Sequence, residues 1–352
     1  MQRIKNMLQF NKGEWSEPYC LLKIMADKKL FLCNSGLLET GDHIHIVGGN
    51  IADGIDYKLC DDVINITFGN ENKKYSTPYI KELLSSVLKE INKKQPRTFP
   101  IPDLEKFFFE IGSPSFKSKS TNKTDCTISV FDDILQSNEN LGFSIKSFLA
   151  GSPTLINASK ATNFTYEVNS ADKKFTALKT KTLLRHLKKD EIAVKYKGMD
   201  SNIYQKNLML IDTQMPVIVS ELMKIYFSSK IKNIADIVEL LKKNNPLNLD
   251  NTSLYQNKVK DFLFFSATGM FPNTEWEGVQ NVDGGCLIVK NNGEVSAFYI
   301  FRKKFLVAFR EYLYLQCFLD TASTTRHVFG RLYQEDNLSY LKLNLQIRIQ
   351  DN

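Results

Sequence analysis

The stretch that decides the fold runs from Asp125 to Lys146 and reads DCTISVFDDILQSNENLGFSIK. Polar and apolar residues alternate toward both of its ends, with the period of two that is typical of β-strands. We therefore predict strands over Cys126–Phe131 and Leu141–Lys146, joined by a polar loop. Together they would form a hairpin near the middle of the chain.

The pairing of this hairpin decides which side chains meet. If Phe131 pairs with Asn140, Asp125 lies opposite Lys146, because each pair of residue numbers then has the same sum. Side chains alternate across a sheet. One face would therefore carry Asp125, Thr127, Ser144 and Lys146. A carboxylate beside an ammonium suits metal-dependent hydrolysis of a phosphodiester, in which the acid holds a divalent cation and the lysine faces the phosphate.

Other parts of the chain extend this pattern into a family resemblance. An Asp followed across a hairpin by an acidic residue, any residue and Lys is the active-site pattern of the PD-(D/E)XK nuclease superfamily. Several words of this sequence resemble type II restriction endonucleases of the HpaII family: KGEWSE at 12–17, GFSIKS at 142–147, SPTLINAS at 152–159, TNF at 162–164 and KLNLQIR at 342–348. They lie near the start, the middle and the end, so the resemblance covers nearly the whole chain.

The resemblance implies an α+β fold with a PD-(D/E)XK nuclease core, a mixed central β-sheet flanked by helices, and additions at both ends. We place the catalytic core at residues 101–215. The region 1–100 would contribute to DNA binding and supply one acid to the metal. The region 216–352, which is helical with a hairpin, would recognise DNA.

The resemblance also implies the activity. The protein would be a type II restriction endonuclease that hydrolyses phosphodiester bonds in duplex DNA with Mg²⁺, at the sequence CCGG, and leaves 5′-phosphate and 3′-hydroxyl ends. A cognate DNA methyltransferase would be its genetic partner. A palindromic target favours a two-fold homodimer by symmetry, although some enzymes of this kind cut as monomers.

Five residues are assigned to the chemistry. Asp125, the carbonyl of Ile145 and an acid such as Glu17 would hold the metal, and Lys146 would assist the attack. Ser144, which we group with the catalytic residues, departs from the superfamily pattern because a serine stands where an acid is usual. One carboxylate alone holds a hard cation weakly, so another acid must come from elsewhere in the chain. Glu17 is the first candidate, followed by Glu14 and Glu167.

Candidate DNA contacts follow the hairpin. Polar side chains that could donate to phosphates or base edges, or could simply turn the chain, are Ser147, Asn157, Ser159, Thr162 and Asn163. Residues 172–197 hold nine Lys or Arg against three acids. A helix predicted over 176–189 would bring Lys181 and Arg185 to phosphates. In a later segment rich in hydroxyls, Arg326, His327 and Arg331 are candidates for reading guanine.

Composition narrows the class of protein. The chain has 352 residues, of which 43% are hydrophobic and 24% charged, with a net charge of +7, which is compatible with a polyanionic partner. It has no run of eighteen apolar residues and no signal peptide, so we predict neither a membrane span nor export. The six cysteines are scattered, without a CxxC pair, as in reduced cytoplasmic proteins. His43 and His45, without further ligands at suitable spacing, are interpreted as structural.

Four further segments have recognisable patterns. A helix is predicted over Glu14–Ala26, either with Ser16 as N-cap, because Pro18 suits only a first turn, or with an earlier start and a kink. Further predictions are helices over Thr77–Lys93 and Met215–Lys243 and a final strand over Tyr340–Ile349. Asp132 and Asp133 are interpreted as residues that turn the hairpin.

Two other functions remain open. A PD-(D/E)XK nuclease of repair or recombination would act on DNA structure, or without sequence preference. A DNA-binding protein that has lost catalysis would account for the serine at position 144.

Overall fold

A computed structural model describes residues 8–93, 96–112, 124–134, 136–169, 185–186, 193–229, 231–322, 329–330 and 332–351. The chain forms two compact units. Unit 1 comprises residues 1–153 and 281–309, and unit 2 comprises residues 154–280 and 310–352. These boundaries differ from those of the three predicted regions, because strands from late in the chain return to the first unit.

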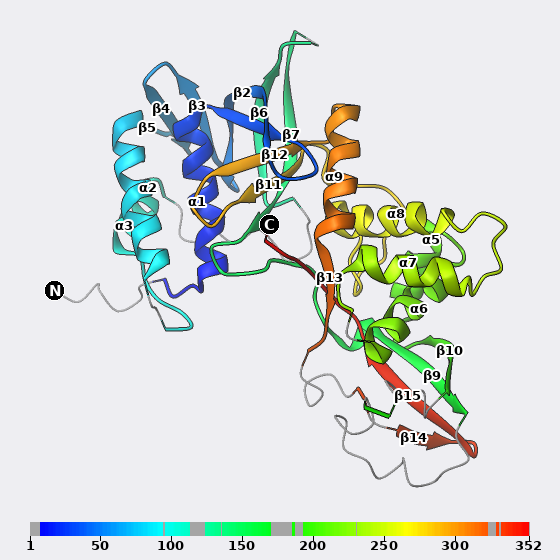
Figure 1. Ribbon diagram of the computed structural model, residues 1–352. Helices are drawn as coiled ribbons and strands as arrows, with labels where there is room; N and C mark the ends of the chain where they lie inside the picture. Colours follow the sequence, from blue (N-terminus) through cyan, green and yellow to red (C-terminus); the bar gives the residue numbers. More distant parts are fainter. Residues whose placement is uncertain are drawn as a thin grey trace. The chain divides into compact units, whose positions relative to one another are not determined.

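Unit 1 is built on a nine-stranded sheet of order β1-β12-β11-β7-β6-β2-β3-β4-β5 (Figure 1). Its strands are β1 (Lys29–Cys33), β2 (Glu39–Ala52), β3 (Ile55–Cys60), β4 (Val63–Phe68), β5 (Glu71–Ser76), β6 (Cys126–Asp132), β7 (Ser137–Ser147), β11 (Gly285–Val289) and β12 (Val295–Tyr299). Because β1 also pairs with β2, six of them pair in a closed ring. The fold is a mixed α+β architecture, as expected.

The predicted hairpin exists as β6 and β7, but its register is not the predicted one. Phe131 pairs with Asn138, and Asn140 pairs with Ser129, so the strands are shifted by two residues and the loop is shorter. A shift of two keeps every side chain on its face. Asp125 now falls opposite Ser144 and no longer opposite Lys146, but the two charged residues still share a face.

The physical reason for the shorter loop is the environment of Asp132. Its carboxylate is 1% exposed and forms an ion pair with Arg302 at 2.9 Å, and it accepts a hydrogen bond from the Ile134 N–H at 2.8 Å. The interpretation of Asp132 as a turn residue is therefore wrong, because Asp132 is the last residue of β6, where it is buried and pairs with Ser137. Asp133 lies in the exposed turn.

Strand β7 lies inside the sheet. It pairs antiparallel with β6 on one side and parallel with β11 on the other, with Cys286 beside Ser144 and Ile288 beside Lys146. The strands β11 and β12 form an antiparallel hairpin that turns at Asn291–Gly293. The strand that carries the candidate lysine is thus held along both edges.

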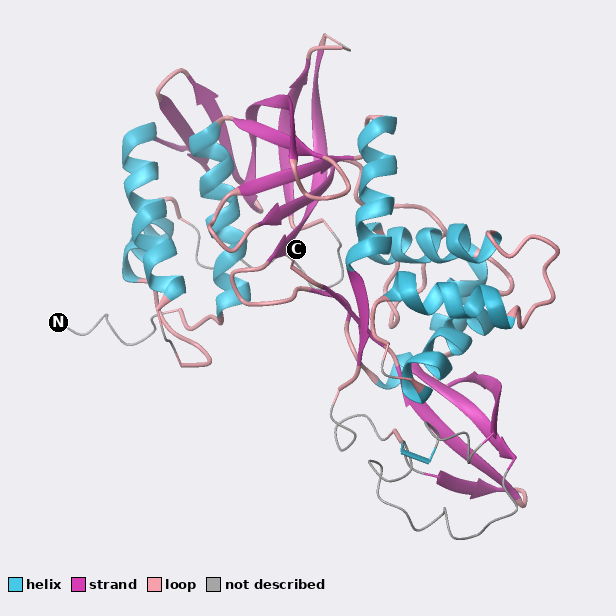
Figure 2. Ribbon diagram, viewed as in Figure 1, coloured by secondary structure: helices cyan, strands magenta, loops and turns pink. Residues whose placement is uncertain are grey.

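Three helices of unit 1 lie together beside the sheet (Figure 2). They are α1 (Lys12–Asp27), α2 (Thr77–Asn92) and α3 (Pro102–Glu110). The prediction of Ser16 as N-cap is wrong, because Asn11 and Glu14 form a capping box at an earlier start and Pro18 lies inside α1. A proline can occupy this position at the loss of one backbone hydrogen bond.

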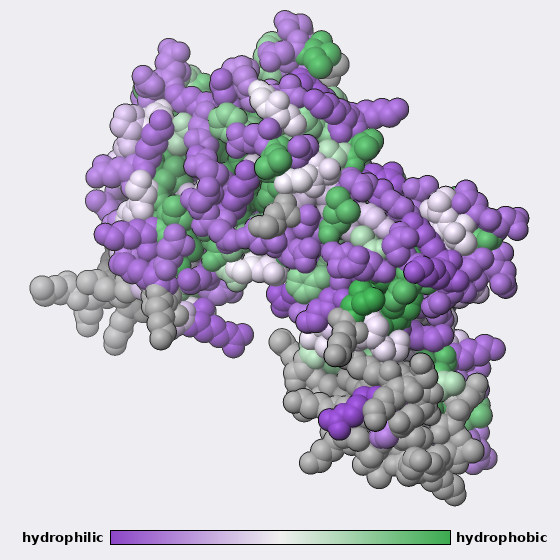
Figure 3. Space-filling model, in the orientation of Figure 1, coloured by the Kyte–Doolittle hydropathy of each residue, from purple (hydrophilic) through white to green (hydrophobic). Residues whose placement is uncertain are grey.

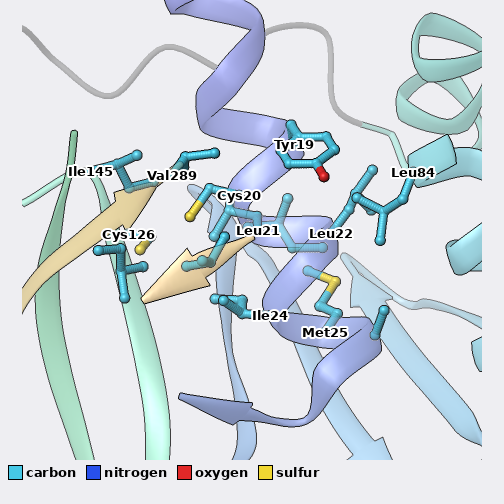
Figure 4. Packing of buried hydrophobic residues seen from close by; sticks show 14 of the residues in the cluster. Tyr19, Cys20, Leu21, Leu22, Ile24, Met25, Leu84, Cys126, Ile145 and Val289 are labelled. Atoms are coloured by element: carbon cyan, nitrogen blue, oxygen red, sulfur yellow. The ribbon is translucent and has the colours of Figure 1, made fainter. Parts of the chain in front are cut away.

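The core of unit 1 lies between α1 and the sheet (Figure 4). Leu21, Leu22 and Met25 of α1 are buried there, with Ile145 of β7 and Val289 of β11. Hydrophilic side chains cover most of the face seen in Figure 3. Within the described residues, none of the helices has the length and apolarity needed to cross a membrane.

Unit 2 combines helices with two small sheets, of order β10-β9-β15-β14 and β13-β16-β8. Its elements include β8 (Thr154–Ile156), η1 (Lys160–Thr162), β9 (Asn163–Asn169), β10 (Ala193–Met199), α5 (Asn202–Ile211), α6 (Met215–Ser228), α7 (Ile234–Asn244), α8 (Leu254–Thr268), β13 (Cys317–Asp320), β14 (Leu332–Glu335), β15 (Leu338–Asn344) and β16 (Gln346–Ile349), and α9 spans Lys303–Gln316. The single helix predicted over 215–243 is two helices, since Asn233 caps α7. The predicted last strand is likewise divided between two sheets at Leu345.

Candidate active site

The candidate site lies where the hairpin begins and β7 ends. Oδ2 of Asp125 accepts a hydrogen bond from the N–H of Ile145 at 2.6 Å. Nζ of Lys146 donates to the carbonyl of the same Ile145 at 3.3 Å. The N–H and C=O of one strand residue point to the same side of the strand. A carboxylate, a main-chain carbonyl and an ammonium therefore converge beside Ile145.

Asp125 is held there by its own main chain as well. It precedes the first residue of β6, and its N–H donates to the carbonyl of Phe143 at 2.8 Å. A short side chain fixed at its backbone has few rotamers left. The placement of the carboxylate thus follows from the pairing of the two strands.

Ser144 lies beneath this surface and does not open onto it. Its side chain is 1% exposed and hydrogen-bonds to the thiol of Cys286, its neighbour in β11. Burial raises the pKa of Cys286 to about 11, against the opposing effects of the Lys146 charge and the Ser144 hydrogen bond. A buried hydroxyl group that forms a hydrogen bond with a thiol is a poor ligand for a hard cation. The second acid has to come from another element.

Glu17 of α1 is the predicted source of that acid, and α1 does approach the site. An added Cβ at Gly13 would lie 3.9 Å from the Cβ of Ala150, so the start of the helix lies beside the chain that follows β7. The side chains of Cys20 and Cys126 point toward one another between α1 and the sheet (Figure 4). Burial raises the pKa of both thiols, and the charges of Asp125 and Glu17 raise it further. The two carboxylates therefore act on the same pair of thiols.

The position of α1 is fixed by long-range hydrogen bonds on either side of Glu17. Nε1 of Trp15 donates to the carbonyl of Phe99 at 2.8 Å, and Oη of Tyr19 donates to the carbonyl of Gly293 at 3.0 Å. Both partners are distant in sequence, so α1 cannot slide without breaking buried bonds. Glu17, which is half-buried, is thereby held in the first half of α1.

The two alternative acids have other roles in the structure. Oε2 of Glu14 accepts a hydrogen bond from the N–H of Asn11 at 2.9 Å in the capping box. Glu167 lies on β9 in unit 2 and forms an ion pair with Lys197 at 2.8 Å. Glu17 remains the first candidate.

The donor set agrees with a hard cation. Carboxylate and carbonyl oxygens are the ligands that Mg²⁺ prefers, with water completing the shell. Within the residues that the structure describes, no group of three or more His, Cys, Asp or Glu side chains could hold a metal ion. A zinc site built from such side chains is thus absent from this part of the chain. The rings of His43 and His45 lie 4.9 Å apart and contact each other edge to face.

Two of the predicted DNA contacts are internal. The side chains of Thr162 and Asn163 are at most 1% exposed. Nδ2 of Asn344 donates to the Ser159 carbonyl at 2.7 Å, to Oγ1 of Thr162 at 3.2 Å and to Oδ1 of Asn163 at 2.7 Å. The structure therefore does not support direct DNA contact by Thr162 and Asn163, because these groups bond to one another inside unit 2.

The other predicted contacts fall into two sets. Asn157 and Arg185 are exposed, and Oγ of Ser147 accepts from the N–H of Leu149 at 3.2 Å. Lys181, Arg326, His327 and Arg331 lie outside the described residues, as does nearly all of the predicted helix over 176–189.

Sequence reasoning missed three residues around these groups. Cys286 and Asp283 contact the hairpin from a segment about 140 residues later in the chain. Asn344 connects three of the segments that resemble the family, 152–159, 162–164 and 342–348, in one hydrogen-bond network. The only signal for Asn344 was its place in the word KLNLQIR. The contacts of Cys286 and Asp283 depend on the parallel pairing of β7 with β11, which no local pattern shows.

Comparison with known proteins identifies the family of the chain. The sequence profile described as HpaII restriction endonuclease matches residues 11–349. The type II restriction enzyme HpaII of Haemophilus parainfluenzae is 36% identical over 354 residues, covering 96% of this chain and 98% of that protein. No solved structure matches the chain. With a match over nearly its whole length, the chain belongs to the HpaII restriction endonuclease family.

Proposed function

We propose that this protein cuts duplex DNA at CCGG in a Mg²⁺-dependent reaction and leaves 5′-phosphate and 3′-hydroxyl ends. Its family makes it a type II restriction enzyme, and the target and the end chemistry are those implied by the resemblance. The observation that carries the proposal is the convergence of the Asp125 carboxylate and the Lys146 ammonium on one residue, Ile145.

The metal would be held by the Asp125 carboxylate, the Ile145 carbonyl and the carboxylate of Glu17. Bound Mg²⁺ would lower the pKa of its water ligand and would neutralise charge on the phosphate. Asp125 and Glu17 bring the negative charge that a hard cation requires, and Ile145 adds a neutral oxygen at a fixed place in the strand. Ser144 would support the site through Cys286 and would not act as a ligand.

Lys146 would bind the scissile phosphate and orient the attacking water. Its ammonium lies at the Ile145 carbonyl, half-buried at the end of β7. A preorganised positive charge is most effective where negative charge develops in the transition state. The lysine is therefore the residue whose loss should lower the rate most without preventing DNA binding.

The arrangement of the strands supports a PD-(D/E)XK core. Two antiparallel strands, β6 and β7, carry the acid and the lysine, β11 runs parallel to β7, and α1 covers one face. Residues 101–153 of the predicted core region fall in unit 1. Its remaining residues, 154–215, fall in unit 2, where DNA contact by Asn157 and Arg185 remains part of the proposal.

Three further statements belong to the proposal. A cognate DNA methyltransferase is the expected genetic partner, because an unprotected genome would be cut. A homodimer would match the two-fold symmetry of a palindromic target. The reaction would take place in the cytoplasm.

A digest of plasmid DNA tests the proposal. Purified protein with Mg²⁺ should give discrete fragments whose ends map to CCGG, and EDTA should abolish cutting. Lys146→Ala should lower the cutting rate at least about 100-fold, whereas Lys58→Ala, at an exposed position of β3, should cut at the wild-type rate.

The same digest separates the rival functions. A smear of fragments would indicate a nuclease without sequence preference. Intact plasmid with a gel shift would indicate a DNA-binding protein without catalysis. Equal rates for Lys146→Ala and the wild type would show that the lysine does not have the proposed role.

A further inference from the structure

The short segment that leads into β11, Asn281–Gly284, contacts the β6–β7 hairpin at β7 and at the chain that enters β6. Oγ1 of Thr124 donates to the carbonyl of Asn281 at 3.1 Å. The N–H of Gly142 in β7 donates to Oδ1 of Asp283 at 2.6 Å, and the N–H of Gly284 donates to the carbonyl of Gly142 at 2.9 Å. The segment thus bonds to the chain just before β6 and to the middle of β7.

The absence of a side chain at Gly142 makes these contacts possible. An added Cβ there would lie 2.8 Å from Cγ2 of Thr124 and 3.4 Å from Oδ1 of Asp283. Thr124 therefore occupies the space over Gly142, on the face that also carries Ser144 and Lys146, and Asp283 lies at ordinary contact distance from it. Any larger residue at 142 would compete with Thr124 for this space.

These bonds act on the candidate site through the chain itself. Thr124 directly precedes Asp125, which lies outside the regular pairing of β6. The bond from Thr124 to Asn281 therefore fixes the approach of the chain to Asp125. The bond from Gly142 to Asp283 fixes β7 four residues before Lys146, which is the length of two strand repeats.

We infer that Asp283 is a positioning residue of the nuclease site. Its carboxylate holds Gly142, and with it β7, against the segment that also holds Thr124, and so sets Asp125 relative to Lys146. A carboxylate is a stronger acceptor for an N–H than a neutral oxygen. The inference rests on the proposed function, and it assigns to Asp283 no contact with DNA or metal.

Three variants of the full chain test this role. Asp283→Ala removes the acceptor and should lower kcat at saturating DNA about 10-fold to 100-fold, because misplacement of reacting groups by about 1 Å has effects of this size. The dissociation constant for CCGG-bearing DNA, measured with Ca²⁺ in place of Mg²⁺, should not change. Asp283→Asn, which keeps an oxygen for the Gly142 N–H, should restore kcat to within about 3-fold of the wild type. Asp53→Ala, at an exposed turn between β2 and β3, is the matched control and should behave as the wild type.

The results separate positioning from the other roles that an acid could have. Failure of Asp283→Asn to rescue kcat, together with weaker binding of Mn²⁺, would make Asp283 a metal ligand and overturn the inference. A wild-type kcat for Asp283→Ala would overturn it too. Both outcomes differ from failure of the proposed function, in which the wild-type protein itself does not cut.

Hydrogen exchange gives a readout that does not depend on cutting. Amide exchange measured by mass spectrometry should be faster in Asp283→Ala for peptides that cover 124–128 and 141–147, and unchanged elsewhere in the sheet. Unchanged exchange in these two peptides would contradict the inference. Thr124→Val should give the same pattern as Asp283→Ala in the first peptide, and Thr124→Ser, which keeps the donor, should not.

Discussion

At the scale of single residues, the candidate site depends on the absence of a side chain at Gly142. Its neighbours are Thr124 and Asp283, and the side chain of Thr124 needs the space that a Cβ would fill. The φ of Gly142 is not in the left-handed region, so the requirement for glycine here is steric and not conformational. That distinction can be tested with alanine.

Gly142→Ala should therefore lower cutting by moving Thr124, and Asp125 with it. We expect a loss of at least about 10-fold in kcat and a loss of stability of about 1 to 3 kcal/mol from overpacking. Gly198→Ala is the control, since an added Cβ there meets no heavy atom within 4 Å. Single-turnover cleavage and thermal unfolding measure the two effects. Full activity in Gly142→Ala would show that the space over this residue is not needed.

The six cysteines differ sharply in their surroundings. Cys60 is exposed, and the other five are buried and free. Burial raises the pKa of Cys286 to about 11 and that of Cys33 to about 12. Since the thiolate is the reactive form, we expect one fast thiol in the native protein when it is titrated with DTNB, and six after unfolding. Cys60→Ser should remove the fast phase. A fast reaction in that variant would show that the core around Cys20 and Cys126 opens readily.

At the scale of elements, an ion pair holds the far end of the β6–β7 hairpin. Asp132, at the end of β6, is bound by Arg302 and accepts a hydrogen bond from Oη of Tyr299 at 3.3 Å. Burial and the charge of Asp132 raise the pKa of Tyr299, so the hydroxyl stays protonated and remains a donor. The ion pair thus ties the hairpin to the end of β12.

Asp132→Ala should destabilise unit 1 by about 3 kcal/mol, because it leaves Arg302 partly buried without its partner. A Trp276→Phe background leaves Trp15 as the fluorescent reporter of unit 1, since the chain has two tryptophans and Trp276 lies in unit 2. Urea unfolding followed at this tryptophan measures the loss. Lys304→Ala, which breaks an exposed ion pair with Asp42, should leave the midpoint unchanged. An equal effect of both variants would contradict the role of burial.

The same ion pair is the reason why only part of this hairpin could be predicted from the sequence. The two strands, and the face that Asp125 and Lys146 share, could be predicted from the alternation of polar and apolar residues. The prediction of the shared face remained correct because the observed register differs from the predicted one by two residues, an even number. The register itself could not be predicted, since it depends on Arg302, 170 residues away from Asp132. The contact of Ser144 with Cys286 depends in the same way on β11. Asn233, in contrast, carried a local capping signal for α7 that the long apolar pattern concealed.

At the scale of the whole molecule, buried tyrosines set the alkaline limit of stability. Burial raises the pKa of Tyr196 and of Tyr226 to about 12, and it also raises the pKa of Tyr57 and of Tyr166 well above the usual value. An exposed tyrosine titrates near about 10. The folded protein therefore keeps protons that the unfolded chain loses, so this contribution to stability is complete below about pH 10 and is lost as the pH rises toward 12.

We expect the urea midpoint to be flat from about pH 8 to about pH 9.5 and to fall steeply above about pH 10. Tyrosinate absorbance at about 295 nm should rise in two steps, first for exposed tyrosines and then together with unfolding. A single step completed near about pH 10, with the protein still folded, would show that these hydroxyls are accessible to water.

The order of the strands in the sheet also bears on how the protein is made. Strand β7 has β11 as its neighbour, and the residues that hold Asp125 and Gly142 in place, Asn281–Gly284, come just before β11. While a ribosome is still synthesising the residues before Asn281, the edge of β7 is unpaired. The hydrogen bonds from Asn281–Gly284 to the hairpin do not yet exist. Incomplete chains should then be harmless to the chromosome of the cell that makes them, because the proposed site would be complete only when translation has passed Val289.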